Sequence, residues 1–181
     1  MRVISGQKRG KKLEALVGDT VRPTTDKVKE SIFNVIQFDI FGAKFLDLFA
    51  GSGQIGIEAL SRGAQLATFV DKNKESINVV KRNLSSTGFE KNAKVINMDS
   101  ILFLEKSSEI FDIAFLDPPY ASELLNESIF LIPKTMSKNG IIICEHPVES
   151  FLPDKFVDFY LSKVYKYGKI AISVYRRKGL N

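Results

Sequence analysis

The feature of this sequence that most constrains its fold is a short apolar strand that runs into a glycine turn and then a helix, within residues 46–56. Apolar residues dominate positions 45–49, glycines occupy Gly51 and Gly53, and residues 55–61 follow helical spacing. Glycines permit a tight turn and a close backbone approach, so the helix can pack directly back on the strand. This unit is typical of open α/β sheets, and we expect an α/β fold built around it.

Strands and helices continue to alternate after this unit. Strands that alternate with helices form a parallel sheet with helices on both faces. The strand at 141–144 follows Asn139-Gly140, which we predict as its turn. The predicted elements are a second strand, a helix and three further strands, at residues 66–70, 73–84, 94–97, 111–116 and 141–144.

The last segment has a different pattern. Residues 157–164 and 170–175 are apolar runs that flank the turn residues 165–169, which predicts a β-hairpin. Mixed sheets tolerate such an antiparallel edge. The whole pattern therefore predicts a Rossmann-like, seven-stranded, mostly parallel sheet with helices on both faces and a C-terminal antiparallel β-hairpin.

The first 43 residues do not follow this alternation. Residues 2–5 and 11–16 flank a glycine-containing segment and predict a hairpin or extended arm. Pro23 is expected to open a helix, with Thr24 or Thr25 as its cap, and Gly42 to end it. We therefore divide the chain into residues 1–43, a basic hairpin and helix, and residues 44–181, the α/β body.

Positive charge is concentrated in the arm. The net charge is +5, and residues 1–12 contain five basic residues and no acidic one, so the rest of the chain is balanced. A neutral body with a basic arm suggests a polyanionic partner, although a solvated tail explains the charge equally well. A second basic cluster lies at residues 176–178. The arm residues in question are Arg2, Lys8, Arg9, Lys11 and Lys12.

Composition excludes several classes of protein. No apolar run approaches the roughly 20 residues that span a bilayer, and the first 12 residues show no secretory signal. Cys144 is the single cysteine and His146 the single histidine, so neither an internal disulfide nor a Cys- or His-based metal site is expected. We expect a cytoplasmic protein without a membrane partner, in which both residues have structural roles.

Acidic residues follow the predicted strands. Gly51, Gly53 and Gly56 match the pattern of a dinucleotide-binding turn, although a turn without a ligand fits as well. Asp71 ends the second strand, where a carboxylate accepts hydrogen bonds from ribose hydroxyls. Asp99 follows the third strand and could accept from an exocyclic amine, although a lone acid is more often a helix cap. Together they indicate a cofactor that contains adenosine.

Asp117-Pro118-Pro119-Tyr120 follows the fourth strand and indicates what kind of group the site would bind. The prolines stiffen the turn and remove two N–H donors. The Asp117 carboxylate and the Pro118 carbonyl then become acceptors for an amino group, and Tyr120 offers a face on which a base can stack. Such a site suits the exocyclic amine of a flipped-out base. A rigid loop with a buried tyrosine is the alternative.

The order of these motifs resembles the class I S-adenosylmethionine-dependent methyltransferases that modify exocyclic amines of bases. The N-terminal motifs are more specific and are similar to the bacterial family that methylates guanine N2 in 16S ribosomal RNA (RsmD type). Gln54 departs from that family, which usually has a smaller residue there, and Asp71 can be glutamate in it. The additional matching segments are residues 1–6, 9–11, 22–26, 33–34, 111–120 and 166–168.

The resemblance implies a set of functional residues. S-adenosyl-L-methionine would be held by Asp47, Gly51, Gly53, Asp71 and Asp99. Catalysis would involve Asp117, Pro118, Tyr120 and, by resemblance alone, Asn34. Arg22 would join the basic arm in binding RNA. The implied partner is ribosomal RNA, within an assembled or partly assembled small ribosomal subunit, and the protein is expected to be a monomer.

Three alternatives stay open at this point. An NAD-dependent oxidoreductase could use the same glycine turn, but it would leave Asp117-Pro118-Pro119-Tyr120 without a role. A nucleic-acid-binding module with an inactive cofactor site would not need the four aspartates. Adenine-N6 methylation of DNA or RNA shares the Asp-Pro-Pro-Tyr motif, but the short span between Tyr120 and Gly140 leaves no room for a domain that reads duplex DNA.

Overall fold

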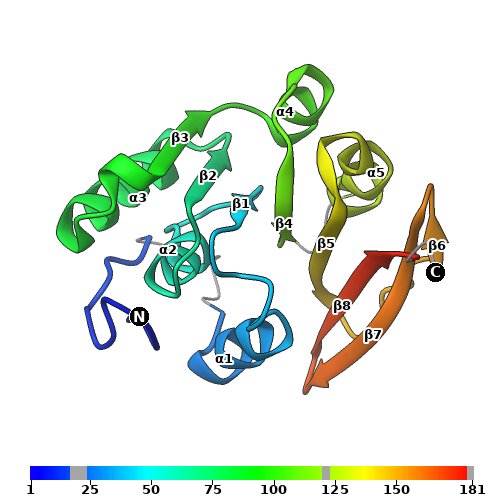
Figure 1. Ribbon diagram of the computed structural model, residues 1–181, viewed down its shortest axis with the longest axis horizontal. Coiled ribbons are helices and arrows are strands. Elements are labelled where there is room, and N and C mark those ends of the chain that lie inside the picture. Colours follow the sequence, from blue (N-terminus) through cyan, green and yellow to red (C-terminus); the bar gives the residue numbers. More distant parts are fainter. Residues whose placement is uncertain (17–23, 120–122, 179–181) are drawn as a thin grey trace.

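The computed structural model describes residues 1–16, 24–119 and 123–178. The strands of these residues form one mixed sheet (Figure 1). The strand order is β3-β2-β1-β4-β5-β8-β7-β6, with parallel pairing from β3 to β5 and antiparallel pairing beyond. The predicted α/β fold is therefore confirmed. The eight strands of these described residues are β1 (Lys44–Asp47), β2 (Leu66–Asp71), β3 (Ala93–Asn97), β4 (Phe111–Leu116), β5 (Met136–Pro147), β6 (Lys155–Phe156), β7 (Phe159–Tyr167) and β8 (Ile170–Arg177).

The sheet differs from the sequence prediction in three places. The two-residue β6 adds an eighth strand, and the turn between β7 and β8 is only Gly168-Lys169, because residues 165–167 pair with β8. Asn139-Gly140 is not a turn but lies inside β5. The β4–β5 register shifts there, from Phe111 opposite Met136 to Ile113 opposite Ile141, so the extra residues bulge out of the pairing.

The helices cover the two faces of the sheet unequally (Figure 1). One face packs against α1 to α3, and the other packs against α4 and α5. No helix among residues 1–16, 24–119 and 123–178 is long and apolar enough to cross a membrane. The helices are α1 (Asp26–Val35), α2 (Gln54–Ser61), α3 (Lys74–Thr87), α4 (Ser100–Lys106) and α5 (Leu124–Leu131), with short 3-10 turns η1 (Glu90–Asn92) and η2 (Ile132–Thr135).

Side-chain caps fix where three of these helices begin. Thr25 accepts a hydrogen bond from the Val28 backbone N–H and is the N-cap of α1, as one of the two predicted threonines. Asn73 caps α3 and Asp99 caps α4 in the same way. A cap satisfies backbone donors that a helix leaves unpaired at its first turn. These caps place the starts of α3 and α4 directly after β2 and β3.

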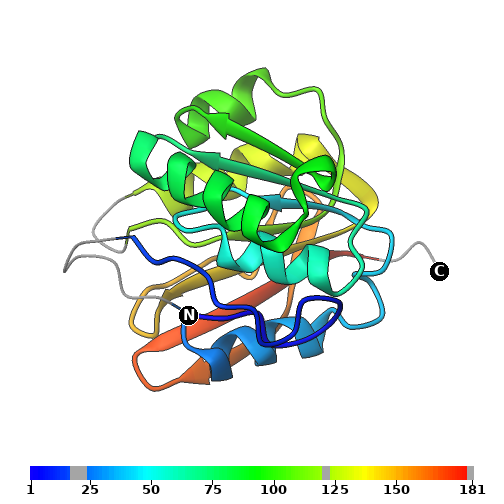
Figure 2. The same ribbon diagram turned by 90° about the vertical axis from the view of Figure 1, so that its left-hand side faces the viewer.

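The N-terminal segment packs on α2 and α3 (Figure 2). The two sides of its predicted hairpin pair at an antiparallel bridge between Arg2 and Lys12, with backbone hydrogen bonds from Val3 to Lys11 and from Leu13 to Met1. Val3 and Leu13 are buried in the same apolar cluster as α1 and α2. The carboxylate of Glu58 on α2, which is fully buried, accepts from the backbone N–H groups of residues 4 and 5 at 2.7 and 3.0 Å. The separation of residues 1–43 from residues 44–181 stays a prediction.

A buried lysine adds to this attachment. Lys29 of α1 is fully buried, and its Nζ donates to the backbone oxygen of Arg2 at 2.6 Å and lies 3.5 Å from Gln54 Oε1. Burial lowers the pKa of Lys29, while the nearby Glu58 carboxylate opposes that shift. At the far end of α2, a Cβ on Gly6 would lie 1.8 Å from the Ser61 carbonyl oxygen, so only glycine fits this contact.

Candidate functional site

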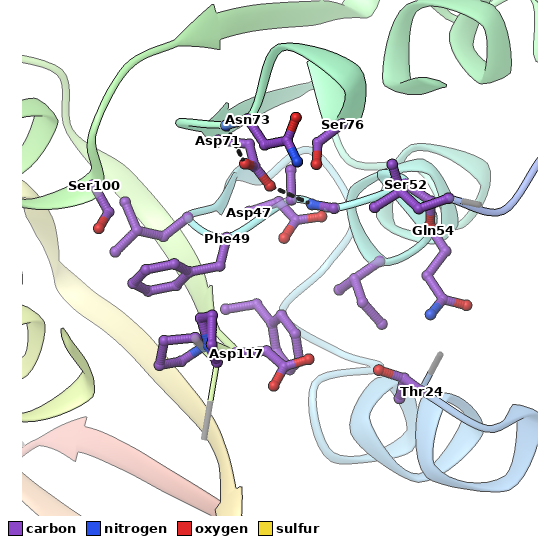
Figure 3. Close-up of a pocket in the computed structure, with 18 of the residues that line it drawn as sticks. Thr24, Asp47, Phe49, Ser52, Gln54, Asp71, Asn73, Ser76, Ser100 and Asp117 are labelled. Carbon is purple, nitrogen blue, oxygen red and sulfur yellow. Dashed lines mark hydrogen bonds between the residues drawn. The ribbon is translucent and has the colours of Figure 1, made fainter. Parts of the chain in front are cut away.

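A cavity of about 550 Å³ lies at the carboxyl ends of β1, β2 and β4 (Figure 3). The turns that follow these strands and the start of α2 form most of its wall, and Met1 and Thr24 of the N-terminal part contribute to it. Cavities of roughly 300–1,000 Å³ hold small ligands, and open α/β sheets bind ligands at this edge. The position of the cavity is therefore set by the parallel strands that the sequence predicted.

One end of the cavity is formed by the glycine turn and Asp71. Gly51 and Gly53 have φ values of 53° and 77°, which glycine adopts without strain. The Asp71 carboxylate accepts from the Gly51 backbone N–H at 2.9 Å and from the Asn73 backbone N–H at 2.8 Å (Figure 3). Asp71 thus fixes the glycine turn to the end of β2.

Asp47 lies at the middle of the cavity wall, at the end of β1. Its carboxylate accepts from the Gly56 backbone N–H of α2 at 3.0 Å, and its side chain is almost fully buried. Burial raises the pKa of Asp47 to about 7, although the hydrogen bond from Gly56 opposes the shift. Gly56 itself is required because a Cβ there would lie 2.3 Å from the Phe69 ring. Asp47 therefore binds a proton more tightly than an exposed aspartate does.

The other end of the cavity is formed by Asp117 and Pro118, directly after β4. In Figure 3 the Asp117 side chain points towards Thr24, at the end opposite Asp71. Burial raises the pKa of Asp117 well above its usual value, and the nearby carboxyl groups of Glu145 and Asp47 raise it further. Asp117 therefore has an unusually high affinity for a proton.

Glu145 is a residue that the sequence analysis did not single out. It lies near the end of β5, is 3% exposed, and its Oε2 is 3.5 Å from the Thr24 Oγ1 donor. The only signal in the sequence was an acidic residue at the end of the predicted fifth strand, in Glu145-His146-Pro147. Met1, Thr24 and Gln54 are further cavity residues to which the analysis assigned no part in a site.

Several predicted site residues lie elsewhere. Asp99 caps α4 by accepting from the backbone N–H groups of residues 101 and 102, and its neighbour Ser100 lines the cavity instead. Gly53 lies behind the wall, where a Cβ would approach Val80. Asn34 is exposed at the far end of α1, about 15 Å along the helix from Thr24. The structure does not bring Asn34 to the cavity.

The remaining predicted residues either lie on the surface or fall outside the residues that the structure describes. Arg2, Lys8, Arg9, Lys11 and Lys12 are all exposed, and Arg2 forms an ion pair with Asp26 at 3.2 Å. Arg22 and Tyr120 lie outside the described residues.

His146 and Cys144 are buried in β5. The two ring nitrogens of His146 lie 2.8 Å from the Pro147 carbonyl oxygen and from Ser173 Oγ, and burial lowers the pKa of the ring. Burial also raises the pKa of the Cys144 thiol. Both environments agree with the structural roles that the sequence suggested.

Comparison with known proteins identifies the family. The family described as "Conserved hypothetical protein 95" matches residues 1–176. The chain belongs to this family. Family relatives include the Bacillus subtilis protein YlbH, which is 42% identical over 99% of this chain and 100% of that protein. The Escherichia coli protein named Ribosomal RNA small subunit methyltransferase D is 36% identical, over 98% of this chain and 90% of that protein.

A solved structure supports the same assignment. The yhhF protein of Escherichia coli superposes with a TM-score of 0.88 at 37% sequence identity, over 98% of both chains. The family resemblance inferred from the motifs is therefore confirmed, and the family fold is the α/β fold described above.

Proposed function

We propose that this protein transfers a methyl group from S-adenosyl-L-methionine to the exocyclic N2 amine of a guanine in 16S ribosomal RNA. One observation carries the proposal: a single cavity has the glycine turn with Asp71 at one end and the acceptors Asp117 and Pro118 at the other. The name of the Escherichia coli relative, which is similar over nearly the whole chain, supports ribosomal RNA of the small subunit as the substrate.

The glycine-turn end fits the cofactor. At Gly51 a Cβ would project into open space with only a Leu16 carbon within 4 Å, so its absence leaves the backbone accessible to a ligand. Asp71 and the turn would contact the adenosine part, and Asp47 would favour a cationic group. S-adenosyl-L-methionine supplies an activated methyl group on a sulfonium. Of the residues predicted to bind it, Asp47, Gly51 and Asp71 line the cavity, whereas Asp99 and Gly53 support the wall.

The other end fits an amino group. The Asp117 carboxyl and the Pro118 carbonyl would accept the two N–H bonds of the guanine amine and direct its lone pair towards the methyl group. They would also stabilise positive charge that develops on nitrogen, which is electrostatic preorganisation. Tyr120, which follows directly in the chain, is proposed to stack on the base.

The decisive experiment identifies the methylated nucleoside. The protein is incubated with S-adenosyl-L-methionine and either naked 16S RNA or small ribosomal subunits from cells that lack this gene, and the RNA is digested for mass spectrometry. N2-methylguanosine is expected, in a single position. N6-methyladenosine would support the adenine alternative instead. Calorimetry that shows tight binding of NADH and none of S-adenosylhomocysteine would contradict the proposal altogether.

We also propose that the basic arm contacts RNA phosphates. The arm is fixed to α2 by Glu58 and Ser61, so its exposed charges have a defined position relative to the cavity. Each phosphate contact adds roughly 0.7–0.9 to the slope of log K against log salt. Neutralising Lys8, Arg9, Lys11 and Lys12 should therefore weaken RNA binding and flatten this slope by about 3.

A matched variant controls for net charge. Lys155, Lys163, Lys166 and Lys169 are exposed lysines of the β6–β7–β8 edge, and their neutralisation removes the same charge elsewhere. This control should keep most of the salt dependence. Equal slopes in the two variants would place the RNA elsewhere.

A further inference from the structure

Gln54 places an amide group on the cavity wall, at the first residue of α2. The residue follows the glycine turn directly, lines the cavity and is only 7% exposed. In Figure 3 its side chain lies between Ser52 and Thr24, with the amide nitrogen on the side of Asp47 and the oxygen on the opposite side. A nearly buried amide group therefore faces the cavity from the start of the helix.

The buried Lys29 of α1 fixes the orientation of this amide. Its Nζ lies 3.5 Å from Gln54 Oε1 and donates to the backbone oxygen of Arg2 at 2.6 Å. The nearby Glu58 carboxylate is bonded instead to Arg62 and to the backbone N–H groups of residues 4 and 5. An ammonium group only donates, so the amide oxygen has to face Lys29 and the amide nitrogen has to face away from it.

The amide nitrogen of Gln54 has no acceptor from the protein within residues 1–16, 24–119 and 123–178. In this part of the chain, the contact with Lys29 is the only hydrogen bond that the Gln54 side chain makes. Buried polar groups in folded proteins are paired in the large majority of cases. The two N–H groups of this amide therefore indicate that a bound ligand supplies the acceptor.

The charges around Gln54 favour an anionic acceptor. The Lys29 ammonium lies behind the amide, and α2 begins here without a side-chain cap, so its first backbone N–H groups and its dipole also attract negative charge. The rest of the wall has the opposite character, because it includes the aspartates that follow β1, β2 and β4. Lys72 also lines the cavity, but it is exposed and follows Asp71 at the other side of the glycine turn.

We propose that Gln54, supported by Lys29, binds the carboxylate of the amino-acid part of S-adenosyl-L-methionine. This inference rests on the proposed function. The amino-acid part carries an ammonium and a carboxylate on one carbon atom. Asp47, which accepts from the Gly56 backbone N–H two residues along the same helix, is an acidic partner for the ammonium. A ligand with both charges thus has a donor and an acceptor beside the first turn of α2.

An acceptor atom of the RNA base is the alternative ligand for Gln54. A neutral base offers a carbonyl oxygen or a ring nitrogen, and neither carries the full charge that Lys29 and the start of α2 favour. The proposed acceptors for the base amine, Asp117 and Pro118, follow β4, whereas Gln54 directly follows the glycine turn. Charge and position therefore both favour the cofactor carboxylate.

Calorimetry with two ligands tests the proposal without RNA. The first is S-adenosylhomocysteine, and the second is its decarboxylated analogue, which keeps the adenosine, the sulfur and the ammonium. Gln54→Leu removes the amide at similar size, so it should lower the affinity for S-adenosylhomocysteine about tenfold, as expected for a hydrogen bond to a charged group. The affinity for the decarboxylated analogue should not change, because that ligand has no carboxylate to lose.

Two further variants sharpen this measurement. Gln54→Glu places a negative charge beside Lys29, where it should lower the affinity for S-adenosylhomocysteine about 100-fold by repulsion of the ligand carboxylate. The decarboxylated analogue should bind this variant at least as tightly as it binds the wild type. Gln65→Leu makes the same chemical change at an exposed residue outside the cavity and should alter neither affinity.

The difference between the two ligands decides the outcome. If Gln54→Leu weakens both ligands by the same factor, Gln54 has only a structural role and the proposal is wrong. If neither affinity changes and single-turnover methylation of RNA slows, the amide contacts the base and the proposal is also wrong. A carboxylate-dependent loss of affinity, together with no methyl transfer to guanine by the wild type, would support this inference and refute the proposed function. Binding of neither ligand by the wild type would refute both.

Discussion

The two ends of the cavity use carboxyl groups in opposite ways. At the β1–β2 end, Asp71 and Asp47 accept hydrogen bonds from backbone N–H groups at 2.8–3.0 Å, which fixes the glycine turn and the start of α2. At the β4–β5 end, Asp117 is next to Glu145, and burial together with the nearby Glu145 and Asp47 carboxyls raises the pKa of Asp117. The hydrogen-bonded carboxylates hold the backbone of the glycine turn in one conformation, whereas the neighbouring buried carboxyls raise the proton affinity of Asp117. The first end is suited to binding and the second to chemistry.

The largest effect is expected at Asp117. Asp117→Ala should lower the rate of methyl transfer about 10²–10³-fold, by analogy with the loss of one preorganised group at a reacting centre. Its carboxyl acts on charge that appears during the transfer, so cofactor affinity should be nearly unchanged. Single-turnover kinetics and calorimetry measure the two quantities. Asp112→Ala, which removes a carboxyl from the same strand outside the cavity, should keep the rate. A near-normal rate in Asp117→Ala would make this turn structural.

A substitution of Asp47 tests whether burial of its charged carboxylate lowers the free energy of unfolding. Its pKa is about 7 in the folded protein, against the ordinary 3.8 of an aspartate side chain. The folded state therefore holds a proton that the unfolded state releases between these pH values, and stability falls as pH rises from about 4 to 7. Asp47→Asn removes this loss, so it should match the wild type near pH 4 and be about 4 kcal/mol more stable at pH 8. Denaturant unfolding at several pH values measures the difference. A constant difference across pH would contradict the raised pKa.

At the glycine-turn end, Asp71→Ala should lower the affinity for the cofactor without lowering the rate of methyl transfer at saturating cofactor. The substitution frees the backbone N–H groups of Gly51 and Asn73, so the turn loses two hydrogen bonds. Two such bonds correspond to roughly 10–100-fold in affinity for S-adenosylhomocysteine. Asp71→Glu, which keeps the acceptor, should be the milder change. If Asp71→Ala also lowered the rate at saturating cofactor, the conclusion that this end acts only in binding would be wrong.

The smallest effect is expected at Thr24. Its hydroxyl is 3.5 Å from Glu145, which is a weak hydrogen bond, so Thr24→Val should lower the rate only about threefold. The adjacent Thr25→Val is the matched control, because Thr25 caps α1 and its loss should cost about 1 kcal/mol of stability with no change in rate. The opposite pattern, with rate loss only in Thr25→Val, would show that the hydroxyl of Thr24 does not support the Asp117–Glu145 pair.

Local patterns predicted where the glycine turn and Asp71 lie in the fold. The glycine turn and Asp71 are close in sequence to the strands that hold them, so apolar spacing and glycine positions were enough. Asp99 shows the limit of such patterns. An acid after a strand looks the same in sequence whether it caps a helix or binds a ligand, and here its carboxylate caps α4.

The chemical end was harder to predict because strand register decides it. Glu145 lies 28 residues after Asp117, and only the β4–β5 pairing makes them neighbours. The same pairing draws Asn139-Gly140 into β5 against its turn signal. Asn34 lies away from the cavity for a simpler reason, because a helix that begins at the cavity carries its last residues away from it.

The contact between Gly6 and Ser61 has a consequence for how a target is chosen. Ser61 ends α2, and the glycine turn precedes the start of the same helix, so the arm and the cofactor end of the cavity are joined by one rigid rod of eight residues, about 12 Å long. If the arm contacts RNA as proposed, the protein measures a set distance from the contacted phosphates to the methylated amine. The nucleotide is then selected by its spacing from a landmark in the folded RNA, and flexibility introduced at Gly6 would blur that selection before it weakened binding.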